Sequence, residues 1–243
     1  MIALSARLEA ILGLLRPCAL LADVCTDHAL LPVAAVLRGL AAKAIAADLR
    51  AAPLRVAGRT IERARVADRV ERLQGDGVAA LAGRPVDALV MAGVSGELMV
   101  ELCEAAPGVL EGVEQLILQA NSDAGAVRAW ALGHGWHLRE ETMVAENGRY
   151  FVVCAFAPGQ GPDPAYALAG WTPEALCRLG PRLLARRDPV AGRWYEGQRD
   201  RVQALVTKGA GRLATELTEW QAACDHLASD GAGGIAAKLV TPD

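Results

Sequence analysis

The feature that most constrains the fold is a regular alternation, over residues 4–157, between short apolar runs and segments of helical periodicity. Five apolar runs predict buried strands, the third more weakly than the others, at residues 19–24, 43–48, 70–74, 87–92 and 115–119. Apolar residues at helical spacing predict helices around these runs, at residues 4–15, 28–37, 51–65, 96–105 and 123–134. Strands that are apolar on both faces are typical of a parallel sheet covered by helices on both sides.

The pattern changes after residue 134. Two strand-like segments, residues 136–146 and 149–157, flank Asn147 and Gly148, and Asn-Gly is a strong signal for a hairpin turn. Alternating strands and helices that end in such a pair predict an α/β fold, a doubly wound, mostly parallel, Rossmann-like sheet with an antiparallel hairpin at its edge. Other nucleotide-binding folds share the first half of this plan.

A Pro- and Gly-rich stretch at residues 157–164 predicts a linker, and only helical periodicity follows it. The apolar residues before and after the Asp188-Pro189 break predict two helices folded against each other. The apolar stripe of the last helix is expected to pack inside this hairpin, which predicts a monomer. The expected parts of the chain are an α/β domain at 1–158, a coiled-coil-like helical domain at 165–228 and a flexible tail at 229–243.

Composition excludes several classes of protein. The formal net charge of −3 argues against a protein that is basic throughout, although it leaves a local basic patch open. The six cysteines form no C-x-x-C pair, so we expect no metal site. The N-terminus lacks the pattern of a signal peptide, and no apolar run is long enough to cross a bilayer, so we expect a cytoplasmic protein without a membrane partner.

Polar and small residues follow four of the predicted strands. In an open α/β sheet, ligands bind at the carboxyl ends of the strands. Asp48 ends the second run, where a carboxylate can accept both hydroxyls of a ribose, and Asp76 follows the third, where it can accept an adenine amino group. The candidate cofactor-binding residues are Asp23, Cys25, Thr26, Asp48, Asp76, Gly77, Ala92 and Gly93.

The motifs that are missing help to choose the ligand. The chain has no G-x-G-x-x-G after a strand and no P-loop, which argues against a dinucleotide or a nucleoside triphosphate. S-adenosylmethionine (SAM) fits better, because it has a ribose and an adenine but no phosphates. The alternative for any single acid is a helix cap, and G-D-G is also an ordinary turn. Four such ends in the same order favour the cofactor site.

A series of short motifs gives the chain a more specific resemblance. The chain resembles the bacterial tRNA adenine-N1-methyltransferases of the TrmK type, and T-D-H-A-x-L-P, at residues 26–32, is the most specific of the shared motifs. The matching segments are residues 4–8 (L-S-A-R-L), 23–32 (D-V-C-T-D-H-A-L-L-P), 44–48 (A-I-A-A-D), 73–77 (L-Q-G-D-G), 92–96 (A-G-V-S-G), 116–121 (L-I-L-Q-A-N), 128–130 (R-A-W) and 180–186 (G-P-R-L-L-A-R).

The resemblance implies a class I SAM-dependent methyltransferase that modifies N1 of an adenosine in the D-loop region of tRNA. Asp27 is the candidate for stabilising the charge that develops on the adenine ring, and the alternative is that it only caps the next helix. His28 is a candidate for orienting the substrate, or else a packed helix-start residue. Asn121 is a candidate polar clamp, or else a loop residue that bonds to backbone.

The C-terminal helices are rich in arginine, which suggests a surface that contacts RNA phosphates. The residues we assign to tRNA binding are Arg182, Arg186 and Arg187, and the alternative is a solvated surface balanced by nearby acids.

Several residues depart from the family pattern at the expected site. Cys25 stands where the family has glycine in the cofactor loop, and Leu30 stands where it has tyrosine. Val94 and Ser95 replace Met-Gly, and Ala120 replaces proline. Two other functions therefore stay open: a methyltransferase of the same fold that acts on a small molecule, and an inactive domain that binds RNA.

Overall fold

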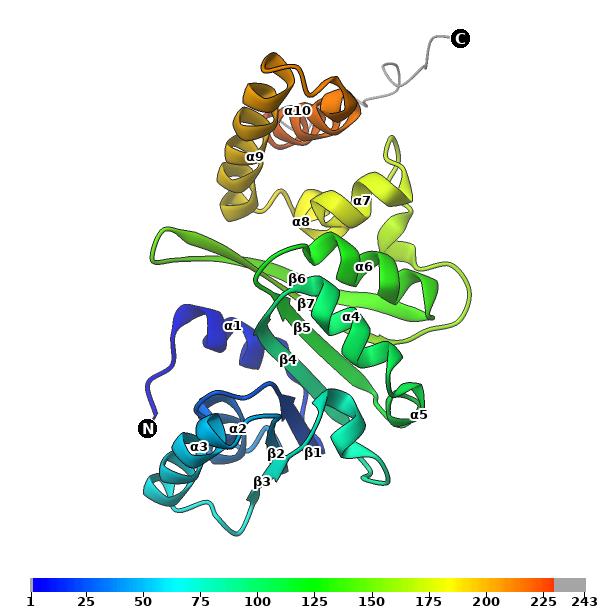
Figure 1. Ribbon diagram of the computed structural model, residues 1–243. Helices are drawn as coiled ribbons and strands as arrows, with labels where there is room; N and C mark the ends of the chain where they lie inside the picture. The colour runs from blue at the N-terminus through cyan, green and yellow to red at the C-terminus, as the bar shows by residue number, and fades with distance from the viewer. Residues whose placement is uncertain (1, 230–243) are drawn as a thin grey trace. The chain divides into compact units, whose positions relative to one another are not determined.

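The computed structural model describes residues 2–229, which form two compact units (Figure 1). The first unit ends at Gly161 and the second begins at Pro162. The predicted tail at 229–243 lies outside the described residues from residue 230 onward.

The first unit is built on one seven-stranded sheet with the order β3-β2-β1-β4-β5-β7-β6. The first five strands are parallel, and β7 runs antiparallel to both β5 and β6. The predicted doubly wound sheet with an antiparallel edge hairpin is therefore confirmed. The strands are β1 (Cys18–Val24), β2 (Ala41–Asp48), β3 (Val70–Gln74), β4 (Ala88–Val94), β5 (Gln115–Ala120), β6 (Trp136–Glu146) and β7 (Arg149–Pro158).

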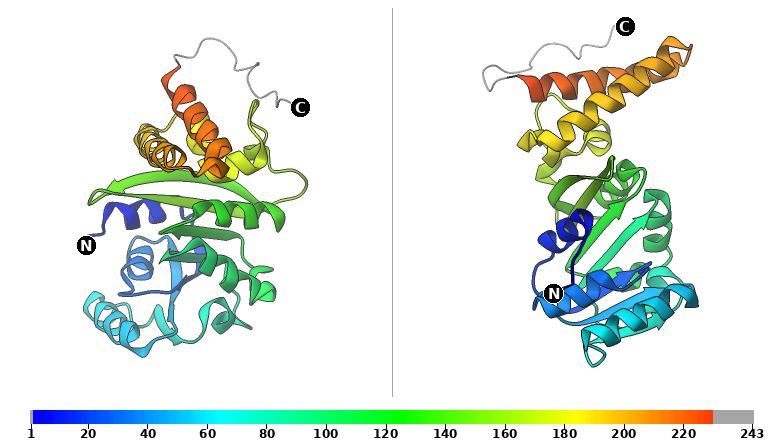
Figure 2. Two further views of the ribbon diagram at one scale, coloured as in Figure 1. Left: turned by 45° about the horizontal axis from the view of Figure 1, so that its top comes forward. Right: turned by 90° about the vertical axis from the view of Figure 1, so that its left-hand side faces the viewer.

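Helices cover both faces of this sheet (Figure 2). Alternate strand residues point to opposite faces. Leu21, Ala88 and Val90 accordingly join one apolar cluster with α1, α2 and α3. Their sequence neighbours Leu89 and Met91 are fully buried and are not part of that cluster. The helices of this unit are α1 (Ala6–Leu14), α2 (Leu30–Leu37), α3 (Ala51–Ala64), α4 (Gly96–Glu104), α5 (Pro107–Leu110) and α6 (Ala124–Gly133), with a 3-10 helix η1 (Gly77–Leu81).

The helix starts follow from local chemistry. The side chain of Ser5 accepts a hydrogen bond from the backbone of Leu8 at the start of α1, and Asp123 does the same for α6. The prediction that a helix begins at residue 28 is wrong by two residues, because Ala29 takes a left-handed backbone conformation (φ 53°) and α2 begins at Leu30. The short elements α5 and η1 were not predicted, since neither is long enough to show a helical period.

The second unit is helical, with more helices than the two predicted. Pro173, Pro181 and Pro189 each begin a helix, because proline lacks a backbone N–H and is tolerated in the first helical turn. The longest two helices, α9 and α10, pack on each other. The elements are η2 (Pro164–Tyr166), α7 (Pro173–Leu179), α8 (Pro181–Arg186), α9 (Pro189–Thr207), η3 (Gly211–Leu213) and α10 (Ala214–Ala228).

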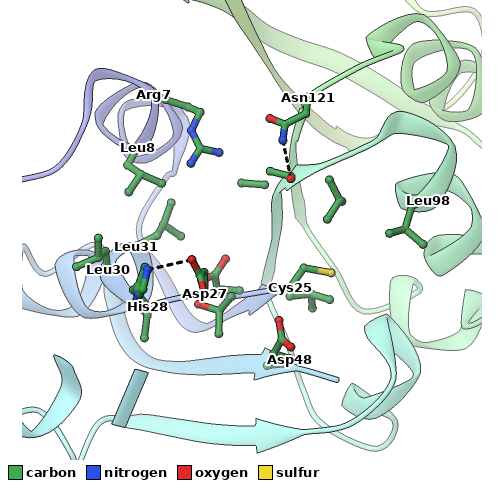
Figure 3. Close-up of a pocket in the computed structure, with 18 of the residues that line it drawn as sticks. Arg7, Leu8, Cys25, Asp27, His28, Leu30, Leu31, Asp48, Leu98 and Asn121 are labelled. Carbon is green, nitrogen blue, oxygen red and sulfur yellow. Dashed lines mark hydrogen bonds and ion pairs between the residues drawn. The ribbon is translucent and has the colours of Figure 1, made fainter. Parts of the chain in front are cut away.

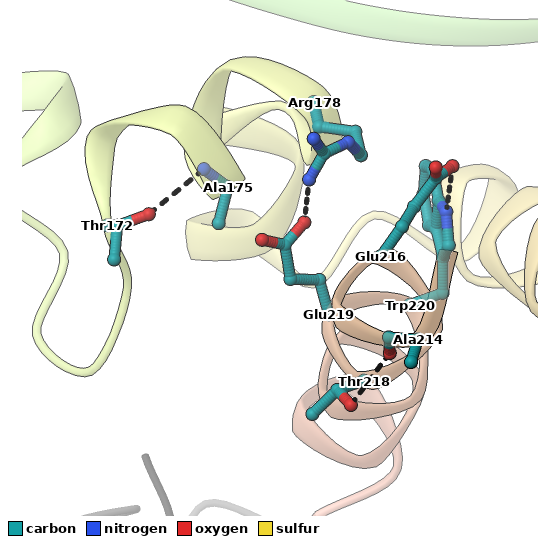
Figure 4. Close-up of polar contacts among 8 residues, drawn as sticks. All are labelled: Thr172, Ala175, Arg178, Ala214, Glu216, Thr218, Glu219 and Trp220. Atoms are coloured by element: carbon teal, nitrogen blue, oxygen red, sulfur yellow. Dashed lines mark hydrogen bonds and ion pairs between the residues drawn. The ribbon is translucent and has the colours of Figure 1, made fainter. Parts of the chain in front are cut away.

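Aromatic rings hold this helical unit together. Trp194 of α9 meets Trp220 of α10 edge to face, with ring centroids 5.2 Å apart, and Trp220 is buried. Arg178 of α7 pairs with Glu219 of α10, and the indole N–H of Trp220 donates to Glu216 over 3.1 Å (Figure 4). The side chain of Trp220 therefore packs within the unit, whereas the predicted monomer stays a prediction.

No helix within residues 2–229 combines the length and apolar character needed to span a bilayer.

Candidate functional site

A cavity of about 810 Å³ lies in the first unit, at the carboxyl ends of the parallel strands (Figure 3). Because the strand order reverses between β1 and β4, the loops after these two strands leave in opposite directions and open a crevice there. The structure brings together every site residue that we predicted in this unit. These are Asp23, Cys25, Thr26, Asp27, His28, Asp48, Asp76, Gly77, Ala92, Gly93 and Asn121.

Two nearly buried carboxylates, those of Asp23 and Asp48, line the cavity. The Asp48 carboxylate accepts hydrogen bonds from the backbone N–H of Arg50 over 2.8 Å and from its Nε over 3.4 Å. Burial raises the pKa of Asp23 to about 7, a hydrogen bond with Thr26 and the Arg7 guanidinium oppose this rise, and Asp48 adds to it. Asp23 therefore titrates near neutral pH, and a cation in the cavity would favour its charged form.

Cys25 adopts the backbone conformation that a glycine would take. Its φ of 64° lies in the left-handed region, which costs a non-glycine residue about 1–2 kcal/mol. The next residue, Thr26, donates its backbone N–H to Ala47 over 2.9 Å and so ties the loop to β2. Burial, reinforced by the charges of Asp48 and Asp23, raises the pKa of the Cys25 thiol to about 11. The side chain is thus a neutral thiol that lines the cavity, and it is not an activated nucleophile.

Asp27 and His28 contact each other at the exposed edge of the cavity. His28 Nε2 lies 2.9 Å from Asp27 Oδ2, and the two side chains are 50% and 70% exposed, respectively (Figure 3). The alternative interpretation of Asp27 as a helix cap is wrong, because the residue that precedes α2 is Ala29 and no side chain caps this helix. An exposed pair of this kind contributes little to stability, so the pair is available for contact with a ligand.

Asn121 joins the loops after β4 and β5. Its Nδ2 donates to the backbone oxygen of Gly93 over 2.6 Å, and its Oδ1 accepts from Gln119 Nε2 over 3.4 Å. Gly96 makes the same junction tight, since a Cβ there would lie 2.1 Å from the backbone oxygen of Asp123. Asn121 thus bonds to backbone, as the alternative interpretation held, while it also lines the cavity.

The departures from the family pattern are accommodated locally. Leu30 and Val94 line the cavity. Ser95 caps α4, where its side chain accepts from the backbone N–H of Leu98 over 3.2 Å. Ala120 ends β5 and pairs with Val94 in the sheet. None of these residues interrupts the strands and helices that surround the cavity.

A second group of cavity residues was not predicted. Arg7, at the start of α1, donates its backbone N–H to Glu146 over 2.9 Å and its Nη1 to Gln119 over 2.6 Å. The guanidinium carbons of Arg7 and Arg149 lie 5.5 and 5.2 Å from the centroid of the Phe151 ring. The motif at residues 4–8 was a signal for Arg7, but nothing in the sequence placed the tip of the β6–β7 hairpin at the site.

The three predicted tRNA-binding arginines belong to the second unit. Arg182 is partly buried on α8, and Arg186, the last residue of α8, is exposed. Arg187 donates to the backbone oxygen of Ser229 and lies 3.4 Å from its hydroxyl, so it holds the end of α10. Their role in binding RNA stays a prediction.

Within residues 2–229, no group of three or more His, Cys, Asp or Glu side chains is placed to hold a metal ion.

Comparisons with known proteins agree with this geometry. Residues 4–154 match the family described as a methyltransferase domain. The tRNA (adenine(22)-N(1))-methyltransferase of Bacillus subtilis (strain 168) is 33% identical over 187 residues, which are 77% of each chain. The crystal structure of the B. subtilis m1A22 tRNA methyltransferase TrmK has a TM-score of 0.80 at 26% identity, over 94% of this chain and 98% of that one. Streptococcus pneumoniae Sp1610 in complex with S-adenosyl-L-methionine has a TM-score of 0.82 at 26% identity, over 91% and 100%.

Proposed function

Because the chain belongs to the family of tRNA (adenine(22)-N(1))-methyltransferases, we propose that it methylates N1 of adenosine 22 in tRNA with SAM as the methyl donor. The observation that carries this proposal is the cavity itself. It combines buried carboxylates at the ends of β1 and β2 with an exposed carboxylate, Asp27, at its edge. The first set suits the cofactor, and the second suits an adenine that enters from solvent.

The residues present fit SAM. Asp48 can accept the ribose hydroxyls, Asp76 the adenine amino group, and Asp23 the ammonium group of the methionine part. Gly93, with a φ of 86°, lets the main chain approach a ligand where a side chain would intervene. The cofactor, when bound, supplies a methyl group already activated by its positive sulfur.

The protein contributes position and charge. N1 of adenine has a lone pair that can attack a methyl group directly, so the barrier falls mainly through alignment and exclusion of water. Methylation makes the adenine ring cationic, and the Asp27 carboxylate stabilises that charge by accepting a hydrogen bond from the 6-amino group. His28 holds Asp27 through their 2.9 Å contact.

The target base has to leave its stack to reach this cavity. We assign Arg182, Arg186 and Arg187 to contacts with tRNA phosphates, and the site of action to the cytoplasm. Replacing all three arginines with glutamine should weaken tRNA binding and flatten its dependence on salt. An unchanged salt slope would refute this assignment.

The proposal is tested with purified protein, unmodified tRNA and SAM. Nucleoside mass spectrometry should find 1-methyladenosine in the product, and a transcript with adenosine 22 replaced by guanosine should gain no methyl group. Calorimetric titration should show micromolar binding of SAM. A folded protein that binds no SAM would support the alternative of an inactive domain that binds RNA. Methylation of a small molecule but not of tRNA would support the alternative of a small-molecule methyltransferase.

A further inference from the structure

The cavity has two walls of opposite charge. The acidic wall consists of Asp23, Asp48 and Asp76, at the ends of β1, β2 and β3. The basic wall consists of Arg7 and Arg149, whose guanidinium groups both lie near the Phe151 ring, and its one carboxylate among the described residues, Glu146, accepts the backbone N–H of Arg7. Figure 3 shows Arg7 on the side of the cavity away from Asp48. The acidic wall suits a cationic cofactor, so the basic wall is left for an anionic ligand.

The basic wall is held in place by buried groups. The Nη1 of Arg7 donates to Gln119, whose side chain is fully buried, and the backbone N–H of Arg7 donates to Glu146 on the hairpin. Arg7 therefore fixes the hairpin tip against the sheet. Phe151 is 8% exposed and presents its ring to both guanidinium groups.

The guanidinium group of Arg149, unlike that of Arg7, has its hydrogen-bond donors available for a ligand. It is exposed at the rim, and among residues 2–229 no carboxylate lies within salt-bridge distance of it. A guanidinium group on the face of an aromatic ring keeps its N–H donors in its own plane. Those donors match two oxygens of one phosphate.

We propose that Arg149, seated on Phe151, binds a backbone phosphate of the RNA next to the adenosine that enters the cavity. The first turn of α1 supports this contact, because the backbone N–H of Arg7 bonds to Glu146 on the hairpin and its side chain bonds to Gln119 in the sheet. The inference rests on the proposed function and assigns the RNA-facing wall of the same site. It places one phosphate contact in the first unit, independent of the arginines of α8.

The test compares Arg149→Gln with Arg139→Gln. Arg139 is an exposed arginine of the same hairpin that does not line the cavity, so its replacement removes the same charge elsewhere. For Arg149→Gln, the KM for tRNA should rise about tenfold, as expected for the loss of one charge-assisted contact. The slope of log Kd for tRNA against log salt should become shallower by about one unit. Arg139→Gln should match the wild type in both.

Two further measurements separate binding from folding. The Kd for SAM and the unfolding temperature should not change in Arg149→Gln. Arg149→Lys should restore the salt slope but not the full KM, because lysine keeps the charge and loses the two-point contact.

The possible outcomes distinguish the two proposals. If the wild type methylates tRNA and Arg149→Gln keeps the wild-type KM and salt slope, the phosphate contact is refuted and the function stands. If the KM rises without a change of slope, Arg149 has a structural role and the contact is again refuted. If the wild type neither binds nor methylates tRNA, the proposed function fails and the inference fails with it.

Discussion

The two walls of the cavity are assembled in different ways. The acidic wall follows from local sequence signals, because each of its carboxylates lies within two residues of the end of a parallel strand. The basic wall joins residues far apart, and the bond between Arg7 and Glu146 spans 139 positions. It forms only because β7 and β6 are added beyond β5, which brings their hairpin to α1. A sequence motif can therefore reveal a cofactor site while the substrate side of the same cavity stays hidden.

The largest effect should come from the acidic wall. Asp48→Asn removes the charge that receives the ribose hydroxyls, and we expect SAM to bind about 100-fold more weakly, from the loss of one or two charge-assisted hydrogen bonds. Isothermal titration calorimetry measures this. Asp68→Asn, at an exposed position outside the cavity, is the control and should bind SAM normally. Equal affinities in the two variants would mean that Asp48 does not bind the cofactor.

Asp27 lies at the edge between the two walls and should affect chemistry rather than cofactor binding. We expect Asp27→Asn to lower kcat roughly 30-fold, which is less than a fully desolvated stabilising group contributes, because the side chain is 70% exposed. The Kd for SAM should not change. Single-turnover methylation of tRNA measures the effect, and a wild-type rate would remove Asp27 from the mechanism.

The pH dependence of cofactor binding sharpens the role of Asp23. Burial raises its pKa to about 7, and the ionised form is the one that attracts an ammonium group. The affinity for SAM should therefore fall about tenfold between pH 8 and pH 6. Asp23→Asn should bind weakly at both pH values, without this change.

The same raised pKa predicts how the ligand-free fold responds to pH. The carboxyl ionises near pH 4 in the unfolded chain and near pH 7 in the folded one. Its contribution to stability is present below about pH 4 and is lost as the pH rises through 7. Across this pH window, the free energy of unfolding of the wild type should fall relative to that of Asp23→Asn as the pH rises. Denaturation of both proteins measures this, and curves of free energy against pH that stay parallel would contradict the raised pKa.

The smallest effect should come from Cys25. Cys25→Gly relieves a left-handed conformation worth about 1–2 kcal/mol but adds disorder to the unfolded chain, so we expect a net gain of at most about 1 kcal/mol in the free energy of unfolding. SAM affinity should rise no more than a few-fold, because the main chain already has the glycine conformation. Urea denaturation and calorimetry measure the two effects.

A matched control is Arg65→Gly. Arg65 also has a left-handed φ, of 58°, and lies outside the cavity. The Arg65→Gly variant should gain free energy of unfolding without any change in its affinity for SAM. A hundredfold gain in affinity for Cys25→Gly alone would mean that the thiol obstructs the cofactor.

The core of the fold could be predicted because its signals are local. Buried strands are apolar runs, and the five parallel strands lie where those runs predicted them, within one or two residues. The start of α2 and the short helix α5 were not predicted, since a left-handed Ala29 and a single helical turn leave no periodic signal. The C-terminal helices were merged into two, because the apolar spacing continues across Pro181, which begins α8, and across Gly209 and Gly211, which lie between α9 and α10.

By itself, the sequence determined the succession of strands and helices along the chain and the acids near the strand ends, since each depends on residues that are neighbours in the sequence. Only the tertiary structure decided that Arg7, Gln119 and Glu146 meet, and that Arg149 lies on Phe151 at the rim of the cavity. The physical reason is that strand order in a sheet is set by long-range packing, and no short motif encodes which hairpin will close one side of a cavity.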